Sequence, residues 1–421
     1  MTCAGCIARQ ASAEDCGFKR NSPAIPSLIP EGFGVNIHFT DPQPGEMKMI
    51  ADAGLSWVRM DFKWDATERE RGHYDFSAYD RLMAAMDQYR IRALFILDYG
   101  NPLYDNGAPP RTKETREAFA RWAIAAAKHF GGREVLWEIY NEPNHKLFWP
   151  PKPNVDEYIS LALTVGRAFR AEAPQEKLIG PATSEIDFPF LEACLKAGLL
   201  NYWSAVSVHP YLRTDPEGAA AHYCRIRQLI SKYAPGTRSG SDGPAVTQAI
   251  PIISSEWGYS SAWPGMTKQK QGQLLARQWL TNTANDIPVS IWYDWRDDGS
   301  DPNEPEHNFG VVSNSYYQDR NPVYSPKPAY LAAKTLTTIF SGYRFEKRIE
   351  VGNPDDYVLA FREGNNLRFA AWTTGHAHSV HLPLNPASYT SIAHTGETIA
   401  SLTADAKGLA LTLTTAPVYI R

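Results

Sequence analysis

Long apolar runs are missing from this 421-residue sequence, and charge of one sign is nowhere concentrated. No run of about 18 apolar residues, the least that crosses a bilayer, occurs, so a membrane span is not expected. Lysine and arginine together number 42 against 46 acidic residues, which gives a net charge of −4. Without a basic patch or a block of like charges, neither nucleic acid nor a membrane surface is an expected partner.

Cysteine is sparse: the chain has five, and Cys3, Cys6 and Cys16 crowd its N-terminus. The gap between Cys3 and Cys6 is typical of half a zinc or redox site, but no second half with matching spacing follows. We therefore expect no metal and no cofactor. Residues 1–29 lack the apolar segment of a signal peptide and are predicted to be a disordered leader. The protein would be periplasmic or secreted if a signal was removed, and otherwise cytoplasmic.

From residue 30 onward, short apolar runs alternate with helical patterns eight times. Near-continuous apolar strands followed by helices indicate a parallel sheet covered by helices. Eight such units predict a (β/α)8 TIM barrel. An open doubly wound sheet is the alternative, although no glycine-rich phosphate loop follows the first strand. The barrel strands are predicted at residues 34–39, 57–62, 91–98, 135–140, 177–180, 205–209, 250–255 and 289–294.

The sequence changes character after residue 341. Short segments of alternating apolar and polar residues follow, separated by glycine, proline, asparagine and aspartate. This pattern predicts a small antiparallel β-sandwich, whose expected role is to pack against the barrel. We thus expect a leader over residues 1–29, a (β/α)8 catalytic barrel over 30–341 and an accessory β-sandwich over 342–421.

Two of the predicted strands run into a glutamate. Residues 137–144, Trp-Glu-Ile-Tyr-Asn-Glu-Pro-Asn, lead to Glu142, and residues 251–258, Pro-Ile-Ile-Ser-Ser-Glu-Trp-Gly, lead to Glu256. In a barrel the reacting groups project from the carboxyl ends of the strands, where strands four and seven face each other. A retaining glycoside hydrolase needs two carboxyl groups about 5–5.5 Å apart, one as nucleophile and one as acid and then base. The pair therefore predicts glycoside hydrolysis, with a carbohydrate as the substrate.

These stretches resemble the clan A glycoside hydrolases, which are retaining (β/α)8 enzymes with Asn-Glu on strand four and Glu on strand seven. Within the clan, the chain is similar to family 39 and to related bacterial endoglycosidases that act on exopolysaccharide. The resemblance covers roughly residues 32–421. The stretches that carry it are residues 137–144, 207–211, 253–258, 291–299, 308–310 and 326–330.

The resemblance implies a role for each side chain at the strand ends. Glu142 would be the acid/base and Glu256 the nucleophile, with Tyr211 orienting Glu256 and Arg59 holding its charge. Asn141 would hydrogen-bond the 2-hydroxyl of the reacting sugar. The other substrate contacts would be His38, His209, Trp257 and Trp292, with Trp295 as the alternative to Trp292 for the floor of the subsite.

Two other functions fit part of the sequence. One is a catalytically silent barrel that binds carbohydrate, although both glutamates are present. The other is a metal-dependent hydrolase using His38, His209 and Asp298, although it lacks the paired histidines usual in such sites. Long loops at residues 101–111, 144–153 and 299–324 are expected to shape the cleft. They leave open the sugar, the linkage and endo or exo action, and the sequence does not predict the oligomeric state.

Overall fold

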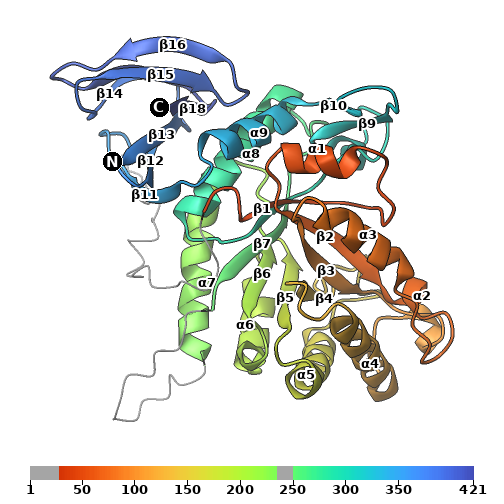
Figure 1. Cartoon of the computed structure of the whole chain (residues 1–421). Coiled ribbons are helices and arrows are strands. Elements are labelled where there is room, and N and C mark those ends of the chain that lie inside the picture. The colour runs from red at the N-terminus through yellow and green to blue at the C-terminus, as the bar shows by residue number, and fades with distance from the viewer. Residues whose placement is uncertain (1–27, 235–249) are drawn as a thin grey trace.

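The computed structural model describes residues 28–234 and 250–421. Eight parallel strands form a closed barrel in chain order, with helices on its outer face (Figure 1). Pairing of the first strand with the last closes the sheet, so the (β/α)8 prediction is confirmed and the open sheet is excluded. Each predicted barrel strand overlaps an observed one. The strands are β1 (Phe33–Asn36), β2 (Trp57–Lys63), β3 (Arg92–Asp98), β4 (Leu136–Ile139), β5 (Lys177–Ser184), β6 (Ala205–His209), β7 (Ile252–Trp257) and β8 (Ser290–Trp292).

Several helices begin where a polar side chain accepts a hydrogen bond from a free backbone amide. Thr112, Asn154, Asp187 and Thr267 do so at the starts of four of them. The helices are α1 (Glu46–Asp52), α2 (Trp64–Thr67), α3 (Ser77–Asp87), α4 (Lys113–His129), α5 (Val155–Glu172), α6 (Phe188–Lys196), α7 (Ala219–Tyr233), α8 (Lys268–Ala284) and α9 (Pro328–Ile339), with 3-10 turns η1 (Asp105–Gly107), η2 (Leu199–Asn201), η3 (Pro216–Gly218) and η4 (Pro305–Asn308).

The barrel interior is apolar at one end and polar at the other. Inward side chains such as Leu136, Ala205 and Ile291 form a core separate from the larger one between strands and helices. Successive inward positions on a strand lie two residues apart. Two residues beyond Leu136 the inward position is Glu138, and four beyond Ala205 it is His209. The apolar core therefore supports a polar layer at the carboxyl ends of the strands.

The C-terminal strands form a six-stranded antiparallel sheet in the order β11-β12-β13-β18-β15-β16, and β14 pairs with β17. This confirms the predicted β-sandwich, which lies beside α8 and α9 (Figure 1). Two of its strands were not predicted from the sequence: β16, in which half of the six residues are polar, and β18, which spans only three residues. The bounds are β11 (Arg344–Arg348), β12 (Asp356–Glu363), β13 (Asn366–Thr373), β14 (His378–Leu382), β15 (Ser388–Ala393), β16 (Thr398–Thr403), β17 (Leu409–Leu413) and β18 (Val418–Ile420); a hairpin of β9 (Val312–Tyr316) and β10 (Tyr324–Pro326) follows the barrel.

A buried ion pair of the barrel accepts a hydrogen bond from the C-terminal sheet. Arg277 of α8 donates from Nε and Nη2 to the two carboxylate oxygens of Glu217, at 2.8 and 2.7 Å. Trp372 of β13 donates its indole N–H to Glu217 Oε1 at 2.7 Å. Glu217 is 1% exposed and Arg277 is 2% exposed, so water cannot solvate either charge if its partner is removed.

Replacing Glu217 with glutamine is expected to lower the free energy of unfolding by roughly 3 kcal/mol, because a buried charge loses its partner. The cost lies at the low end for such pairs because Asp215 remains 3.1 Å from Arg277. Chemical denaturation measures the change. The control is Glu192→Gln, which breaks an exposed pair with Lys232 and should change stability far less. Equal effects of the two substitutions would contradict the importance of this buried pair.

Predictions for Cys3, Cys6, Cys16 and nearly all of the leader fall outside the described residues. Ile29, within the predicted leader, is buried, and its amide donates to the carbonyl of Tyr343 at 3.2 Å. Of the described helices, none is long and apolar enough to cross a membrane.

Candidate active site

Arg59 lies at the centre of the polar layer, and all five of its N–H groups have partners. Nε donates to Glu138 Oε2 at 2.9 Å, and Nη1 donates to Glu256 Oε2 at 2.5 Å and Asn36 Oδ1 at 3.1 Å. Nη2 donates to Asn141 Oδ1 at 2.9 Å and faces a histidine. Burial alone would lower the pKa of Arg59, but Glu138 and Glu256 raise it above its ordinary value. Arg59 is therefore a fixed positive charge around which the layer is ordered.

His209 connects this arginine to Glu142. Its Nε2 lies 3.3 Å from Arg59 Nη2, and its Nδ1 lies 3.0 Å from Glu142 Oε1. Since a guanidinium can only donate, Nε2 accepts and we assign the imidazole proton to Nδ1. His209, fully buried, thus donates to Glu142 as a neutral ring.

A register shift in β7 directs Glu256 inward. Ile253 faces the barrel interior, so strict alternation would turn Glu256 toward the helices. The pairing of β7 with β8 is irregular between Ser254 and Trp257, and beyond the irregularity it is Trp257 that packs outward. Bulges of this kind commonly re-aim a side chain beside an active site.

Both oxygens of Glu256 accept hydrogen bonds, and a carboxylate oxygen of Glu256 lies close to Glu142. Arg59 donates to Oε2, and the hydroxyl of Tyr211 donates to Oε1 at 2.7 Å. Burial and the charge of Glu256 raise the pKa of Tyr211, so its hydroxyl keeps its proton. Carboxylate oxygens of Glu142 and Glu256 lie within 4.8 Å of each other. The two glutamates therefore face each other across the barrel mouth.

The chain leaves β4 in a left-handed conformation at Tyr140 and Glu142, whose φ angles are 65° and 42°. Such a conformation costs roughly 1–2 kcal/mol for a residue with a Cβ. The neighbouring strands hold it, because Tyr140 N donates to Leu97 O at 3.1 Å and Glu142 N donates to Ala182 O at 3.0 Å. Strained backbone of this kind clusters at functional sites. Here it accompanies the placement of Asn141 and Glu142 in the polar layer.

The structure corrects the tryptophan predictions. Trp257 and Trp292 are 0% exposed and Trp295 is 1% exposed, all in the core between strands and helices. Because Ile291 faces the interior, Trp292 faces the helices, where its N–H donates to the carbonyl of Phe309 at 3.2 Å. Trp295 donates to Glu46 Oε1 at 2.9 Å in the same outer layer. With no ring face open to a sugar, none of the three forms the floor of a subsite.

Two residues of the site were not predicted from the sequence. Glu138 is 0% exposed and pairs with Arg59. Its position inside the apolar run Leu-Trp-Glu-Ile could have indicated a buried ion pair, because a buried charge needs a partner. Tyr293 is half-buried and packs edge-on against His38, with ring centroids 5.6 Å apart. Burial and the charges of Asp294 and Glu256 raise the pKa of Tyr293, so this aromatic ring lies near the glutamate pair.

A second pair of carboxyl groups lies at the ends of β2 and β3. Asp98 is fully buried, and neither of its oxygens has a hydrogen-bond partner within residues 28–234 and 250–421. Burial and the charge of Asp61 hold the pKa of Asp98 well above its usual range. Asp98 therefore holds a proton more tightly than an ordinary carboxyl group.

The structure brings six of the predicted site residues into one hydrogen-bonded network, and His38 lies at its edge. His38 Nε2 is 3.4 Å from Asn36 Nδ2, and its side chain is 39% exposed. The members of the network are Arg59, Asn141, Glu142, His209, Tyr211 and Glu256.

A closed (β/α)8 barrel with two glutamates facing each other at its mouth defines a class of protein, the glycosidases of clan A. The family model for cellulase, glycosyl hydrolase family 5, matches residues 30–299. The chain belongs to this family, and it is a glycosidase. A comparison with curated proteins gave no match.

Solved structures of glycoside hydrolases share the architecture of the chain. A family 39 glycoside hydrolase from Bacteroides cellulosilyticus WH2 is 25% identical, with 95% of this chain and 82% of that chain covered and a TM-score of 0.77. A family 39 β-xylosidase from Caulobacter crescentus is 16% identical, with 95% and 97% covered and a TM-score of 0.64. A family 30 endoxylanase from Clostridium papyrosolvens C71 is 13% identical, with 94% and 97% covered and a TM-score of 0.63. The predicted likeness to clan A and to family 39 is confirmed.

Proposed function

We propose that this protein is a retaining glycoside hydrolase that cleaves a polysaccharide or oligosaccharide by double displacement. Glu142 is the acid/base and Glu256 is the nucleophile. The separation of the two glutamates carries the proposal, since their oxygens approach within 4.8 Å. Retaining enzymes hold their carboxyl groups about 5–5.5 Å apart, whereas inverting enzymes need about 6.5–9.5 Å to admit a water molecule.

The hydrogen bonds divide the two roles. Glu256 accepts from a guanidinium and a phenol, both of which favour the ionised carboxylate that a nucleophile must be. Glu142 accepts a hydrogen bond from a neutral imidazole, and no cation of the described chain pairs with it directly. Glu142 is therefore the carboxyl group that can hold a proton for the leaving group.

In the first step, Glu142 gives its proton to the glycosidic oxygen while Glu256 attacks the anomeric carbon and forms a glycosyl ester. In the second, the Glu142 carboxylate takes a proton from water, whose oxygen attacks the same carbon and releases Glu256. Asn141 assists because its Oδ1 is occupied by Arg59, which leaves Nδ2 to donate to the sugar 2-hydroxyl. That contact strengthens as positive charge develops on the ring.

We propose a β-linked glucan or xylan as the first substrate class to test. The family model is named for cellulase, and the similar structures include a β-xylosidase and an endoxylanase. Near Glu142, Phe148 stacks on Tyr99 with ring centroids 5.7 Å apart, and Leu147 is 70% exposed. We propose that these side chains offer an apolar surface to the leaving-group sugar. Trp149, another residue of that loop, is buried and takes no part in this surface.

The product first released should have the same anomeric configuration as the bond cleaved, because two inversions occur at one carbon. Proton NMR of an aryl β-glycoside during its early hydrolysis measures this before mutarotation. Aryl glycosides and plant and bacterial polysaccharides form the substrate panel, and mass spectrometry of the product lengths separates endo from exo action. Release of the inverted anomer would contradict the proposed roles.

A further inference from the structure

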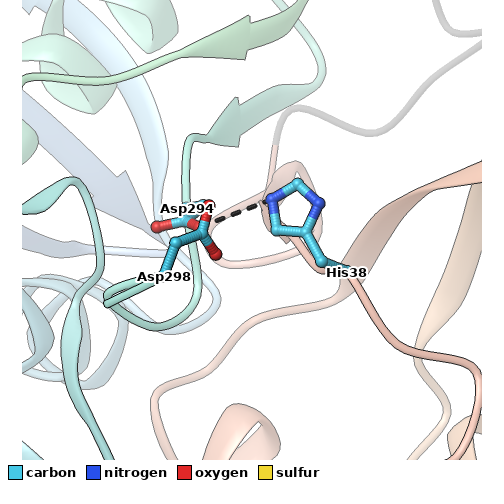
Figure 2. A group of neighbouring side chains, drawn as sticks. All are labelled: His38, Asp294 and Asp298. Carbon is cyan, nitrogen blue, oxygen red and sulfur yellow. Dashed lines mark ion pairs between the residues drawn. The ribbon is translucent and has the colours of Figure 1, made fainter. Parts of the chain in front are cut away.

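Three side chains of metal-ligand type meet beside the barrel mouth. His38 follows β1, and Asp294 and Asp298 follow β8, the neighbouring strand in the closed sheet. Figure 2 shows the imidazole of His38 directed at the carboxylate of Asp294, with Asp298 alongside. One ligand atom from each residue lies within 4.8 Å of the other two. The closing of the barrel therefore creates a three-ligand cluster.

Asp294 is a buried carboxylate that lacks hydrogen bonds. It is 1% exposed, and neither of its oxygens has a hydrogen-bond partner in the described parts of the chain. The Nε2 atom of His38 lies 3.5 Å from its Oδ2. A buried carboxylate without hydrogen bonds is unfavourable, and a bound cation would offset that cost.

The amide of Asn36 favours a lone pair on the histidine nitrogen in this cluster. Asn36 Oδ1 accepts from Arg59, so its Nδ2 is the atom that faces His38 Nε2 at 3.4 Å. An N–H group beside Nε2 disfavours a proton on that nitrogen. A lone pair and a carboxylate that point at each other repel, unless a proton or a metal ion lies between them. The 3.5 Å between His38 Nε2 and Asp294 Oδ2 is long for a shared proton and leaves room for a metal ion.

We infer that His38, Asp294 and Asp298 bind a first-row divalent cation of the Zn²⁺ or Mn²⁺ kind. Imidazole and carboxylate are the ligands that such ions accept. Two ligands on a tetrahedral ion with bonds of about 2.1 Å lie about 3.4 Å apart, which matches the 3.5 Å between His38 and Asp294. His38 and Asp298 are exposed, so further coordination positions are open to solvent. The alternative metal site drawn from the sequence comprised His38, His209 and Asp298. Both ring nitrogens of His209 already have partners, so Asp294 takes its place in the proposed site.

The cation would lie on the nucleophile side of the mouth. Asp294 and Asp298 follow β8, which neighbours β7, the strand that carries Glu256, and the ring of Tyr293 packs against His38. Resting on the proposed function, the open coordination positions would take an oxygen of a bound sugar.

The test measures Mn²⁺ binding by electron paramagnetic resonance on chelator-treated full-length protein, without substrate. Mn²⁺ is the probe because the thiolates of Cys3, Cys6 and Cys16 favour softer ions. One equivalent is expected to bind, and Asp298→Ala and Asp294→Asn should each weaken binding by at least about tenfold. Asp298 is exposed, so its substitution does not threaten the fold.

The matched control is Asp80→Asn. Asp80 forms a surface pair with His129 at 2.7 Å but belongs to no three-ligand cluster among the described residues, so its loss should leave Mn²⁺ binding unchanged. Absence of binding would overturn the inference. So would binding that survives Asp298→Ala but is lost in Glu142→Gln, because the ion would then sit on the Glu142, His209 and Glu256 cluster. Since no substrate is present, failure here is distinct from failure of the hydrolase proposal.

Discussion

Glu256→Ala should lower kcat at least about 10⁴-fold, because without a nucleophile no glycosyl ester can form. This loss corresponds to roughly 5 kcal/mol of transition-state stabilisation. The protein should remain folded, because Arg59 keeps its buried partner Glu138 at 2.9 Å. Azide in the space left by the side chain should attack the anomeric carbon directly and restore turnover. Steady-state kinetics on an aryl glycoside and NMR of the glycosyl azide, expected with inverted configuration, measure both effects.

The control for this variant is Glu306→Ala. Burial and the charge of Glu256 raise the pKa of Glu306, so this carboxyl group is influenced by the charge of the site but is not one of the two catalytic glutamates proposed. Its removal should leave turnover largely intact, and azide should add nothing. Full activity in Glu256→Ala, or an azide product of retained configuration, would assign the nucleophile to another residue.

The barrel and its two glutamates were predictable because their signals are local. Eight apolar runs separated by helical patterns require only a count, and a carboxylate at a strand end needs only the rule for where barrel sites lie. Glu142 and Glu256 carry that signal within stretches of eight residues. The closed sheet then brings the two glutamates together, and this proximity cannot be read from either stretch of sequence alone.

Trp257 was mispredicted because the register shift in β7 turns it outward, and Trp292 and Trp295 were mispredicted because the sequence does not show where β8 stops. The strand spans Ser290–Trp292, and beyond its end alternation no longer says which way a side chain points. Trp292 still follows the alternation and faces outward, and Trp295 reaches the outer layer through a hydrogen bond to Glu46. An error of one residue in the position of a strand end reverses the predicted direction of a side chain, from the barrel interior to its exterior.

The charged network was hidden for another reason. Arg59 and Glu138 lie 79 positions apart on strands that are not neighbours, so their pairing depends on the interior width of the barrel. The register shift that turns Glu256 inward lies within Ser-Ser-Glu-Trp, which contains no glycine or proline that would indicate a bulge. The cluster of His38 with Asp294 likewise requires β8 to close against β1. Tertiary geometry therefore decides which predicted side chains meet.

Glu142→Ala should separate substrates by their leaving groups. A natural glycan needs its leaving oxygen protonated, and losing a general acid costs about 10²–10⁴ in rate. A dinitrophenyl glycoside leaves without a proton, so formation of the glycosyl ester should slow by less than about tenfold. Glu256 keeps its hydrogen bonds to Arg59 and Tyr211 in this variant, so the nucleophile stays in place. The second step should then limit turnover, because no base activates water.

Azide provides the decisive contrast between the two glutamate variants. In Glu142→Ala it needs no general base, so it should attack the glycosyl ester and give a product of retained configuration, opposite to that from Glu256→Ala. A burst of dinitrophenolate followed by slow turnover would report accumulation of the ester. Matched aryl glycosides that differ only in the leaving group supply the internal control. Equal rate losses across that series would show that Glu142 does not donate the proton, and the roles of the two glutamates, whose oxygens lie within 4.8 Å of each other, would then need reassignment.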